Sequence, residues 1–186
     1  MKKITTLAFC LFILGSTIFA YDLSVGVGGV YGWMDDTYNY KSRDEMRFHR
    51  TQFGGSAFFG TKYTEFNFTV RMSQNEWEYW EYESDETEPG GEDLLVLSVG
   101  GYAKYPFSFG TQIVLFPTIG VDFDAIENMI YLWFRAGLGL DIFFTERFFL
   151  RGQALYGYGL TFMSPDFKTA TPGHCPFFKV GFGWMF

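Results

Sequence analysis

Short runs in which apolar residues occupy every second position recur along almost the whole of this chain. Between residues 65 and 74, for example, Phe66, Phe68 and Val70 alternate with polar or charged residues. Because successive side chains of a β-strand point to opposite faces, such a run predicts a strand with one apolar and one polar face. Eight runs follow this pattern: 23–33, 51–61, 65–74, 93–104, 109–123, 131–143, 148–160 and 177–186.

The first 20 residues differ from the rest. Lys2 and Lys3 precede an apolar stretch at residues 7–14, and the small residue Ala20 stands before a change of composition. This order is typical of a cleaved secretory signal. The apolar stretch is too short for a membrane-spanning helix, which needs about 20 residues. We therefore expect a signal peptide at residues 1–20 and one mature domain at residues 21–186.

Charge and cysteine content exclude several classes of function. Without the two signal lysines the chain has 12 basic and 21 acidic side chains and no basic tract, which argues against nucleic-acid binding. A lipoprotein signal at Cys10 lacks the small residue that should precede the cysteine, so Cys10 is expected to leave with the signal. Cys175 then has no partner for an internal disulfide. No two histidines or cysteines have ligand spacing, so neither metal nor cofactor is expected.

The predicted connections differ in length at the two ends of the strands. Long ones at 34–50, 75–92, 124–130 and 161–176 alternate with short ones at 62–64, 105–108 and 145–147. Strands of about ten residues, in even number, with loops of unequal length, predict an all-β fold, an eight-stranded antiparallel up-and-down transmembrane β-barrel. A soluble eight-stranded barrel or sandwich is the alternative, and it would turn its apolar face inward.

Charged residues on the polar face are expected to point into the barrel, because they would be prohibitive in lipid. If the 145–147 turn is centred on Glu146, Asp141 lies opposite Arg151 as a structural ion pair. Glycine pairs such as Gly157 and Gly159 would leave room in a narrow interior. The predicted lumen network comprises Glu65, Arg71, Lys104, Asp122, Arg135, Asp141, Arg151 and Lys179.

Aromatic side chains make up 41 of the 186 residues, and girdles at the two membrane interfaces would accommodate many of them. At the long-connection end we expect Tyr31, Trp33, Tyr131, Tyr156 and Tyr158. At the short-connection end we expect Tyr63, Phe66, Tyr105, Phe144, Phe148, Trp184 and Phe186.

The C-terminal motif and two earlier stretches carry a resemblance to a known family. The final F-x-V-x-F-x-W-x-F and the stretches 116–124 and 134–160, rich in glycine and aromatics, resemble the small eight-stranded outer-membrane barrels of diderm bacteria, of the OmpA, OmpX and OmpW kind. The resemblance implies an outer-membrane location with periplasmic termini and extracellular long loops. It also implies contact with outer-membrane lipid, periplasmic chaperones and the assembly machinery, which would read Phe178, Val180, Phe182, Trp184 and Phe186.

Members of this class differ in function: they anchor, adhere, pass small apolar compounds or, in a few cases, modify lipids. Catalysis would need a histidine with a serine or acidic partner near the outer rim. His49 and His174 are the only histidines, and Ser164 and Asp166 lie near the second in sequence. Their spacing fixes no triad, so no enzyme is predicted.

A narrow, porin-like, OmpW-like channel for small apolar solutes is the function that we predict first. Pro117 interrupts the fifth strand and cannot donate to its ladder, which could open a lateral route into the membrane. The alternative is that the interior is simply packed and that Pro117 marks a bulge. The residues proposed for the route are Phe58, Val96, Val114, Phe116, Pro117 and Leu155.

The connection at residues 75–93 contains nine acidic residues and no basic one. It could bind cations or a basic partner, which makes a structural or adhesive surface barrel the alternative function. It could equally be a hydrated loop that charge repulsion extends. The candidate contact residues are Trp77, Tyr79, Trp80 and Tyr82.

Overall fold

The computed structural model describes residues 23–40, 45–81, 86–126, 129–162 and 167–186. The predicted signal peptide, Tyr82, Ser164 and Asp166 lie outside these ranges. No helix in the described ranges is long and apolar enough to cross a membrane. The strands are β1 (Ser24–Tyr40), β2 (Glu45–Gly60), β3 (Thr64–Glu81), β4 (Glu86–Lys104), β5 (Phe107–Phe109), β6 (Ile113–Ile126), β7 (Met129–Phe143), β8 (Phe148–Phe162) and β9 (Phe167–Met185).

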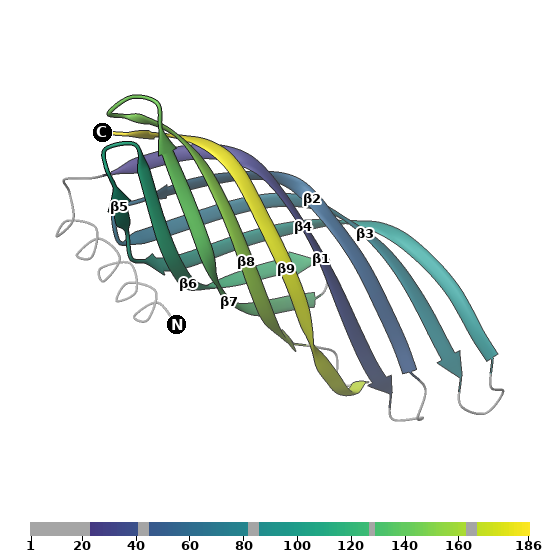
Figure 1. Cartoon of the computed structure of the whole chain (residues 1–186). Helices are drawn as coiled ribbons and strands as arrows, with labels where there is room; N and C mark the ends of the chain where they lie inside the picture. Colours follow the sequence, from purple (N-terminus) through teal and green to yellow (C-terminus); the bar gives the residue numbers. More distant parts are fainter. Residues whose placement is uncertain (1–22, 41–44, 82–85, 127–128, 163–166) are drawn as a thin grey trace, which may run out of the picture.

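Eight long strands form a closed antiparallel barrel, as predicted (Figure 1). The order of neighbours is β4-β3-β2-β1-β9-β8-β7-β6, and pairing of β4 with β6 closes the wall. The first and last strands are neighbours, with Ser24 opposite Met185. The short strand β5 is additional and pairs with the start of β6.

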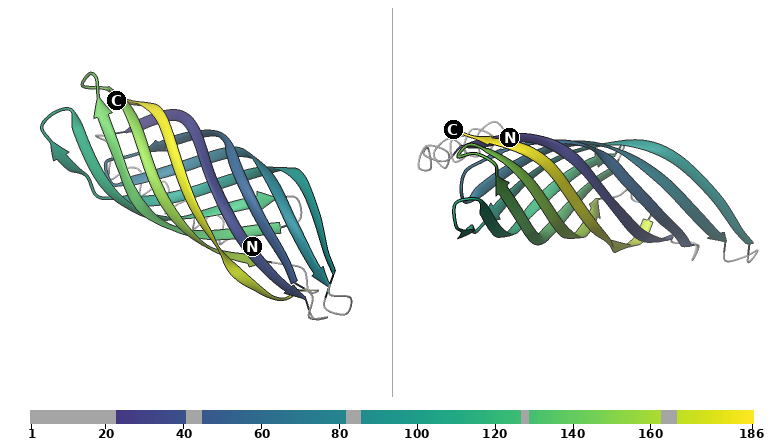
Figure 2. Two further views of the ribbon diagram at one scale, coloured as in Figure 1. Left: turned by 45° about the vertical axis from the view of Figure 1, so that its right-hand side comes forward. Right: turned by 45° about the horizontal axis from the view of Figure 1, so that its top comes forward.

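Side chains alternate between the interior and the outer surface along each long strand. On β4, Val99 is 57% exposed on the outside, whereas Ser98 next to it is buried inside. Charged residues such as Arg71 and Arg135 are buried, and large apolar residues cover the outer wall. The faces are therefore assigned as predicted, and a soluble barrel with an apolar interior is excluded. Figure 2 shows the closed wall from two further sides.

Three of the connections predicted to be long are mostly strand. β1 continues to Tyr40 and β2 begins at Glu45, while β3 and β4 extend to Glu81 and from Glu86. β9 likewise begins at Phe167. The prediction ended these strands where the outer face ceases to be apolar, but backbone pairing continues beyond that point.

Two other connections were also predicted incorrectly. The predicted long connection 124–130 is nearly absent, because β6 runs to Ile126 and β7 begins at Met129. The predicted tight turn 105–108 contains β5 instead, followed by a turn in which Gly110 has a φ of 68°. We call the end of the barrel with the connections 61–63, 105–112 and 144–147 the short-turn end, and the opposite end the hairpin end.

Part of the wall extends beyond the closed barrel at the hairpin end. β4 pairs with β6 only from Val96 onward, so its earlier residues pair with β3 alone. In Figure 1, β1 to β4 reach well past the ends of β6, β7 and β8. We call residues 35–40, 45–50, 75–81 and 86–95 the projecting sheet.

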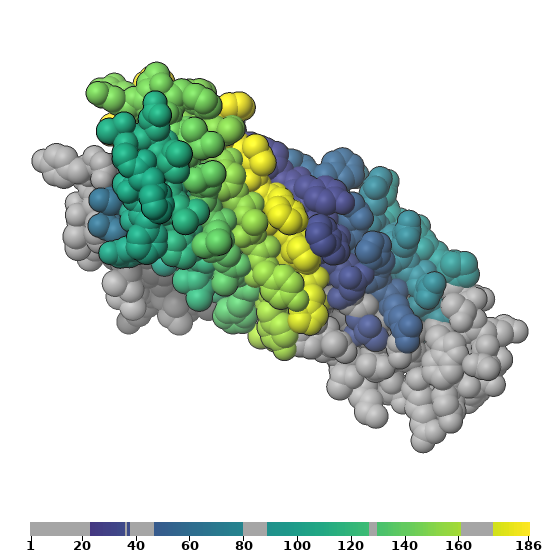
Figure 3. All heavy atoms as spheres, in the orientation of Figure 1, coloured from purple at the N-terminus to yellow at the C-terminus, as the bar shows by residue number. Residues whose placement is uncertain are grey.

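The aromatic residues expected in the two girdles face the outside of the barrel, except for one tyrosine. Tyr31, Tyr156 and Tyr158 are exposed on the outer wall, whereas Tyr131 is buried inside. Tyr131 lies on the same face of β7 as Arg135, four residues away, and therefore points into the lumen. On the side shown in Figure 3, side chains of β1, β8 and β9 cover the wall closely.

Glycines on the inner face make room for large rings, as the sequence suggested. A Cβ on Gly159 would lie 2.6 Å from the Trp133 ring, and one on Gly139 would lie 2.2 Å from the Phe116 ring. Both rings are buried. Side chains at these glycines would therefore compete with the rings for the interior of the barrel.

Candidate functional site

The interior at the short-turn end is organised around Arg151 on β8. Its Nε and Nη2 donate to the two carboxylate oxygens of Asp141 on β7 at 2.7 and 2.6 Å. The two residues are directly opposite in the ladder, so the predicted ion pair is confirmed. Arg151 also forms an ion pair with Glu65 of β3, across the lumen. One guanidinium thus joins three strands.

Glu65 is shared by several donors. Its Oε2 accepts from Arg151 and from the Lys104 amine, the latter at 3.3 Å. Its Oε1 accepts from Asn67 at 3.0 Å and from Gln153 at 3.2 Å. A buried carboxylate with this many donors is well compensated for the loss of water.

Three phenyl rings enclose the same guanidinium. The Arg151 Cζ lies 4.6 Å from the ring centre of Phe58, 5.1 Å from that of Phe116 and 5.0 Å from that of Phe149. Such cation–π contacts favour a charge that is shielded from water. Phe58 and Phe116 therefore pack around a cation and do not line an open apolar path.

A second cluster fills the middle of the barrel. The Arg135 Nε lies 2.5 Å from Asp122 Oδ2, to which the Tyr102 hydroxyl donates, also at 2.5 Å. In the same cluster, Arg71 of β3 forms an ion pair with Asp124 of β6 at 2.7 Å. The sequence had left Asp124 in a connection, although it continues the inward alternation of β6.

Lys179 on β9 lies beside this cluster without an ion pair among the described residues. Its amine is 4.7 Å from the Tyr102 ring centre and 5.6 Å from that of Phe177. The same Phe177 ring lies 4.5 Å from Arg135 Cζ. Aromatic faces thus stabilise cations here where carboxylates are few.

The interior of the hairpin end contains residues that the sequence did not single out. Arg50 donates to the Tyr131 hydroxyl at 2.8 Å, and Tyr131 stacks on Trp133 with ring centres 6.1 Å apart. Arg50 precedes the predicted second strand, but it shares the inner face with Gln52. Extending the predicted second strand back to Arg50 would have identified this residue as part of the interior.

The large side chains of these layers are buried inside the barrel. Arg71, Arg135 and Trp133 are each 1% exposed, and Val96 is fully buried. The described side chains at this level are therefore almost entirely out of contact with solvent. Val96 belongs to an apolar cluster at this height: Val30, Met34, Leu94, Val96, Tyr102, Ile126, Tyr131, Trp133, Leu155, Cys175 and Phe177.

The residues proposed for an apolar route are divided among different places. Val96 and Leu155 belong to the apolar cluster, Val114 is half-buried near the short-turn end, and Pro117 is exposed on the outer wall. Phe58 and Phe116 both pack against the Arg151 guanidinium. They do not form one continuous path.

Pro117 does not mark a bulge. The β6–β7 register is unbroken from Ile113 to Ile126, with Pro117 opposite Leu138. Its carbonyl accepts from the Tyr105 N–H at 3.1 Å, just past the end of β4. Because the N–H and C=O of a residue in an antiparallel strand point to the same neighbour, its missing donor also faces the end of the β4–β6 ladder.

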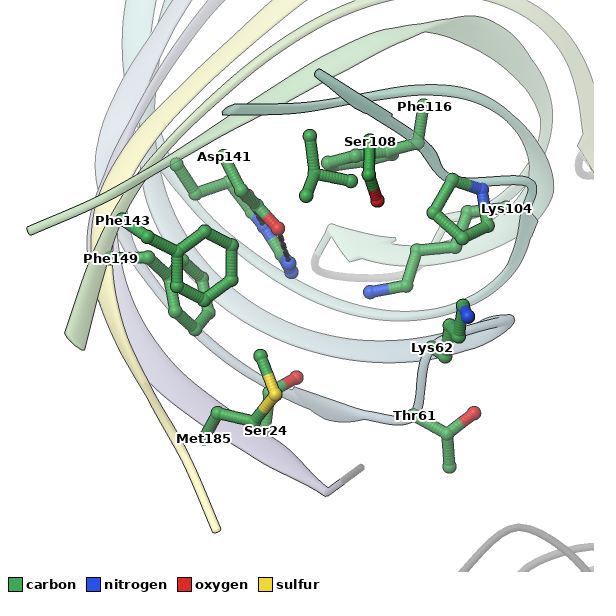
Figure 4. Close-up of a pocket in the computed structure, with 13 residues that line it drawn as sticks. Ser24, Thr61, Lys62, Lys104, Ser108, Phe116, Asp141, Phe143, Phe149 and Met185 are labelled. Atoms are coloured by element: carbon green, nitrogen blue, oxygen red, sulfur yellow. Dashed lines mark hydrogen bonds and ion pairs between the residues drawn. The ribbon is translucent and has the colours of Figure 1, made fainter. Parts of the chain in front are cut away.

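A cavity of about 210 Å³ opens at the short-turn end (Figure 4). Its inner wall includes Lys104, Asp141 and Arg151, which belong to the network described above. The remaining lining residues are Ser24, Thr61, Lys62, Pro106, Ser108, Val114, Phe116, Phe143, Phe149 and Met185.

Two acidic and two aromatic residues of β3 lie on opposite faces of the projecting sheet. Glu76 and Glu78 of β3 are exposed on the outer face, whereas Trp77 and Tyr79 are half-buried on the inner face. Trp77 covers Gly90 of β4, where a Cβ would lie 2.0 Å from its ring. Trp80 is also in β3, and Tyr82 lies outside the described residues. The prediction of a loop was therefore wrong at residues 75–81.

Both histidines lie on the outer wall near the hairpin end. His49 Nδ1 is 2.5 Å from Asp35 Oδ1, and His174 Nδ1 is 2.7 Å from the Tyr156 hydroxyl. Within the described ranges, no three or more His, Cys, Asp or Glu side chains are arranged to hold a metal ion.

The outer face of β9 is continuously apolar near the short-turn end. The five residues of the predicted assembly signal are all exposed there: Phe178, Val180, Phe182, Trp184 and Phe186.

No family model matches the sequence, and no curated protein matches it. Solved structures with a similar fold include the N-terminal β-barrel domain of Pseudomonas aeruginosa OprF, with 18% identity over 87% of this chain and 99% of that chain and a TM-score of 0.42. Neisserial surface protein A is 13% identical over 88% of this chain and 97% of its own, with a TM-score of 0.44. The Escherichia coli outer membrane protease OmpT is 8% identical over 89% and 96%, with a TM-score of 0.37. At these TM-scores the matches assign neither a family nor a function.

Proposed function

We propose that this chain is an integral outer-membrane protein of a diderm bacterium, exported by a signal at residues 1–20. Its outer wall exposes large apolar side chains, including Val27, Ile119 and Val180, over far more surface than a water-soluble monomer exposes. A closed barrel also leaves no unpaired strand edge in the lipid layer. By resemblance to the OmpA, OmpX and OmpW kind, the short-turn end faces the periplasm, and the assembly machinery reads the outer face of β9.

Within this class, the geometry favours a closed surface barrel of structural or adhesive function over an open channel. The observation that carries this proposal is the packed interior, where Arg71, Arg135 and Trp133 are each 1% exposed. Breaking the ion pairs of Arg71 or Arg135 to open a pore would leave charges unpaired in the interior.

The projecting sheet is the part available to a partner outside the membrane. A spanning strand needs about 9–11 residues, whereas β3 has 18 and β4 has 19. Its outer face presents Glu76 and Glu78, which suits a cation or a basic partner. His49 does have an acidic partner near the outer rim, Asp35 at 2.5 Å, but neither histidine is hydrogen-bonded to a described serine or cysteine that could act as a nucleophile, and the proposal assigns no catalytic site.

Flux through refolded protein tests this function. We expect planar bilayers that contain the barrel to show no stepwise conductance, and liposomes to show no swelling with small sugars. Empty bilayers and a known open porin are the controls. Stable single-channel steps would overturn the closed barrel.

Passage of small apolar solutes is the second candidate. It is favoured by apolar side chains within the lumen, among them Val96 and Leu155. Liposome uptake of an apolar solute, measured beside that of a sugar, separates the two functions. Uptake of the apolar solute alone would favour this candidate, and uptake of neither would exclude it.

A further inference from the structure

The cavity at the short-turn end has two chemically different sides. Phe143 and Phe149 form an aromatic wall with ring centres 5.2 Å apart, whereas the Phe116 ring lies 5.4 Å from the Lys104 amine. Lys104 and Lys62 lie on the other side, and Figure 4 shows the Lys104 amine pointing into the cavity across from Phe143. An aromatic wall that faces ammonium groups suits a ligand with an apolar body and an anionic group.

The carboxylates near the cavity are already engaged. Both oxygens of Asp141 accept from Arg151. Glu65, just behind the cavity, accepts from Arg151, Lys104 and two amides. Two carboxylates thus serve two buried cations, and they have little capacity left for a further cation.

The lysine amines, in contrast, have more N–H donors than described hydrogen-bond acceptors. An ammonium group has three N–H donors, and Lys104 contacts Glu65 through a single bond of 3.3 Å. Lys62 lies in the 61–63 connection with its amine 5.6 Å from the Tyr63 ring centre, and it pairs with no described carboxylate. The Lys104 amine faces the cavity, so an anion beside it would satisfy its remaining donors, and the exposed Lys62 side chain at the border could reach the same anion.

The size of the cavity limits the ligand. The cavity has a volume of about 210 Å³. That is room for one ring or a short chain with its anionic group, and it excludes an intact phospholipid. Thr61, Lys62, Ser108 and Met185 border the cavity at the short-turn end, so a ligand would enter from that side.

We propose that this cavity is a binding site for a small amphiphilic monoanion, such as an aryl or short-chain carboxylate. The anion lies between Lys62 and Lys104, and its apolar body contacts Phe143 and Phe149. The site ends at the Arg151 network, so the ligand is held at the short-turn end and does not cross the barrel. The cavity lies at the opposite end of the barrel from the projecting sheet, so ligand binding there does not depend on a partner of that sheet.

The test uses the full mature barrel in phosphatidylcholine nanodiscs, with 4-fluorobenzoate as the probe and ¹⁹F NMR as the readout. We expect saturable binding beyond that to empty nanodiscs, at least tenfold tighter than binding of neutral 4-fluorobenzyl alcohol. Ser108→Trp, which fills the border of the cavity, should abolish it. Equal affinity for the alcohol, or no saturable binding of the carboxylate, would overturn the proposal.

A matched pair of charge variants locates the anion. Lys62→Met should weaken fluorobenzoate binding about fivefold, as expected for a partly exposed charge pair. Arg147→Met removes a cation from a neighbouring connection at the same end but outside the cavity, and it should leave binding unchanged. Equal effects of the two variants would show a general attraction of anions to this end and refute the site. Heat-modifiable gel mobility confirms that each variant is folded.

Discussion

At the scale of single residues, the interior of this barrel depends on matching each large or charged side chain with a specific neighbour. Arg151 has Asp141, Glu65 and three phenyl rings around it. Trp133 lies over Gly159, which has no side chain to obstruct it. Substitutions at such positions should therefore lower the free energy of unfolding more than the same substitutions on the outer wall.

Two glycines on β8 allow a direct comparison. Gly159→Ala would place a Cβ 2.6 Å from the buried Trp133 ring, whereas a Cβ on Gly152 meets nothing within 4 Å. We expect Gly159→Ala to lower the free energy of unfolding by about 1–3 kcal/mol, and Gly152→Ala to be nearly neutral. Urea-induced unfolding in lipid vesicles, followed by tryptophan fluorescence, measures both. Equal stability of the two variants would contradict the ring-over-glycine packing.

Removal of a buried cation should have a larger effect. Arg135→Met leaves Asp122 buried with the Tyr102 hydroxyl as its hydrogen-bond donor among the described side chains, and we expect a loss of about 3–5 kcal/mol in the same unfolding assay. Changing Asp122 to Asn as well should recover a large part of the loss. Arg147→Met, on an exposed turn, is the control and should stay within about 0.5 kcal/mol. A double variant no more stable than the single one would refute the pairing.

The sequence predicted this residue chemistry well where alternation was regular. The eight predicted lumen charges, from Glu65 to Lys179, are all buried. Which cation meets which carboxylate could be predicted only for directly opposed residues such as Asp141 and Arg151. Pairs across the lumen, such as Glu65 with Arg151, depend on the curvature and stagger of the closed wall.

At the scale of strands, the interior and exterior were predicted more accurately than the ends. The outer alternation of β3 remains regular after Met72, but its residues become Gln74, Glu76 and Glu78. A criterion based on apolar residues stops there, although the backbone pairs on to Glu81. Strand ends in such a barrel are set by the turn and not by the edge of the apolar band.

The end of the β4–β6 ladder gives a prediction for Pro117. Because its missing donor faces the end of β4, Pro117→Val should not repair a weak point within the wall. We expect unchanged uptake of apolar solutes into liposomes and unchanged heat-modifiable mobility. Leu138→Val, on the opposing strand, is a control for the change of volume. A clear fall in the uptake of apolar solutes with Pro117→Val, but not with Leu138→Val, would support a lateral route through the wall.

At the scale of the whole molecule, the two ends of the barrel differ in construction. The short-turn end holds the cavity and the Arg151 network. The hairpin end carries the projecting sheet, whose outer face is acidic at β3. The sequence predicted this asymmetry from unequal connections, but it placed the extra length in loops. An extended sheet offers a partner two fixed faces, whereas a loop would have to be ordered on binding.

The seam between β1 and β9 makes the wall a ring in which every long strand has two neighbours. Ser24 lies opposite Met185 across that seam, so the two ends of the barrel sequence are adjacent in space. A short linker that joined them, with a new opening at the 144–147 connection, would preserve every strand pairing between β1 and β9. The architecture is therefore open to circular permutation.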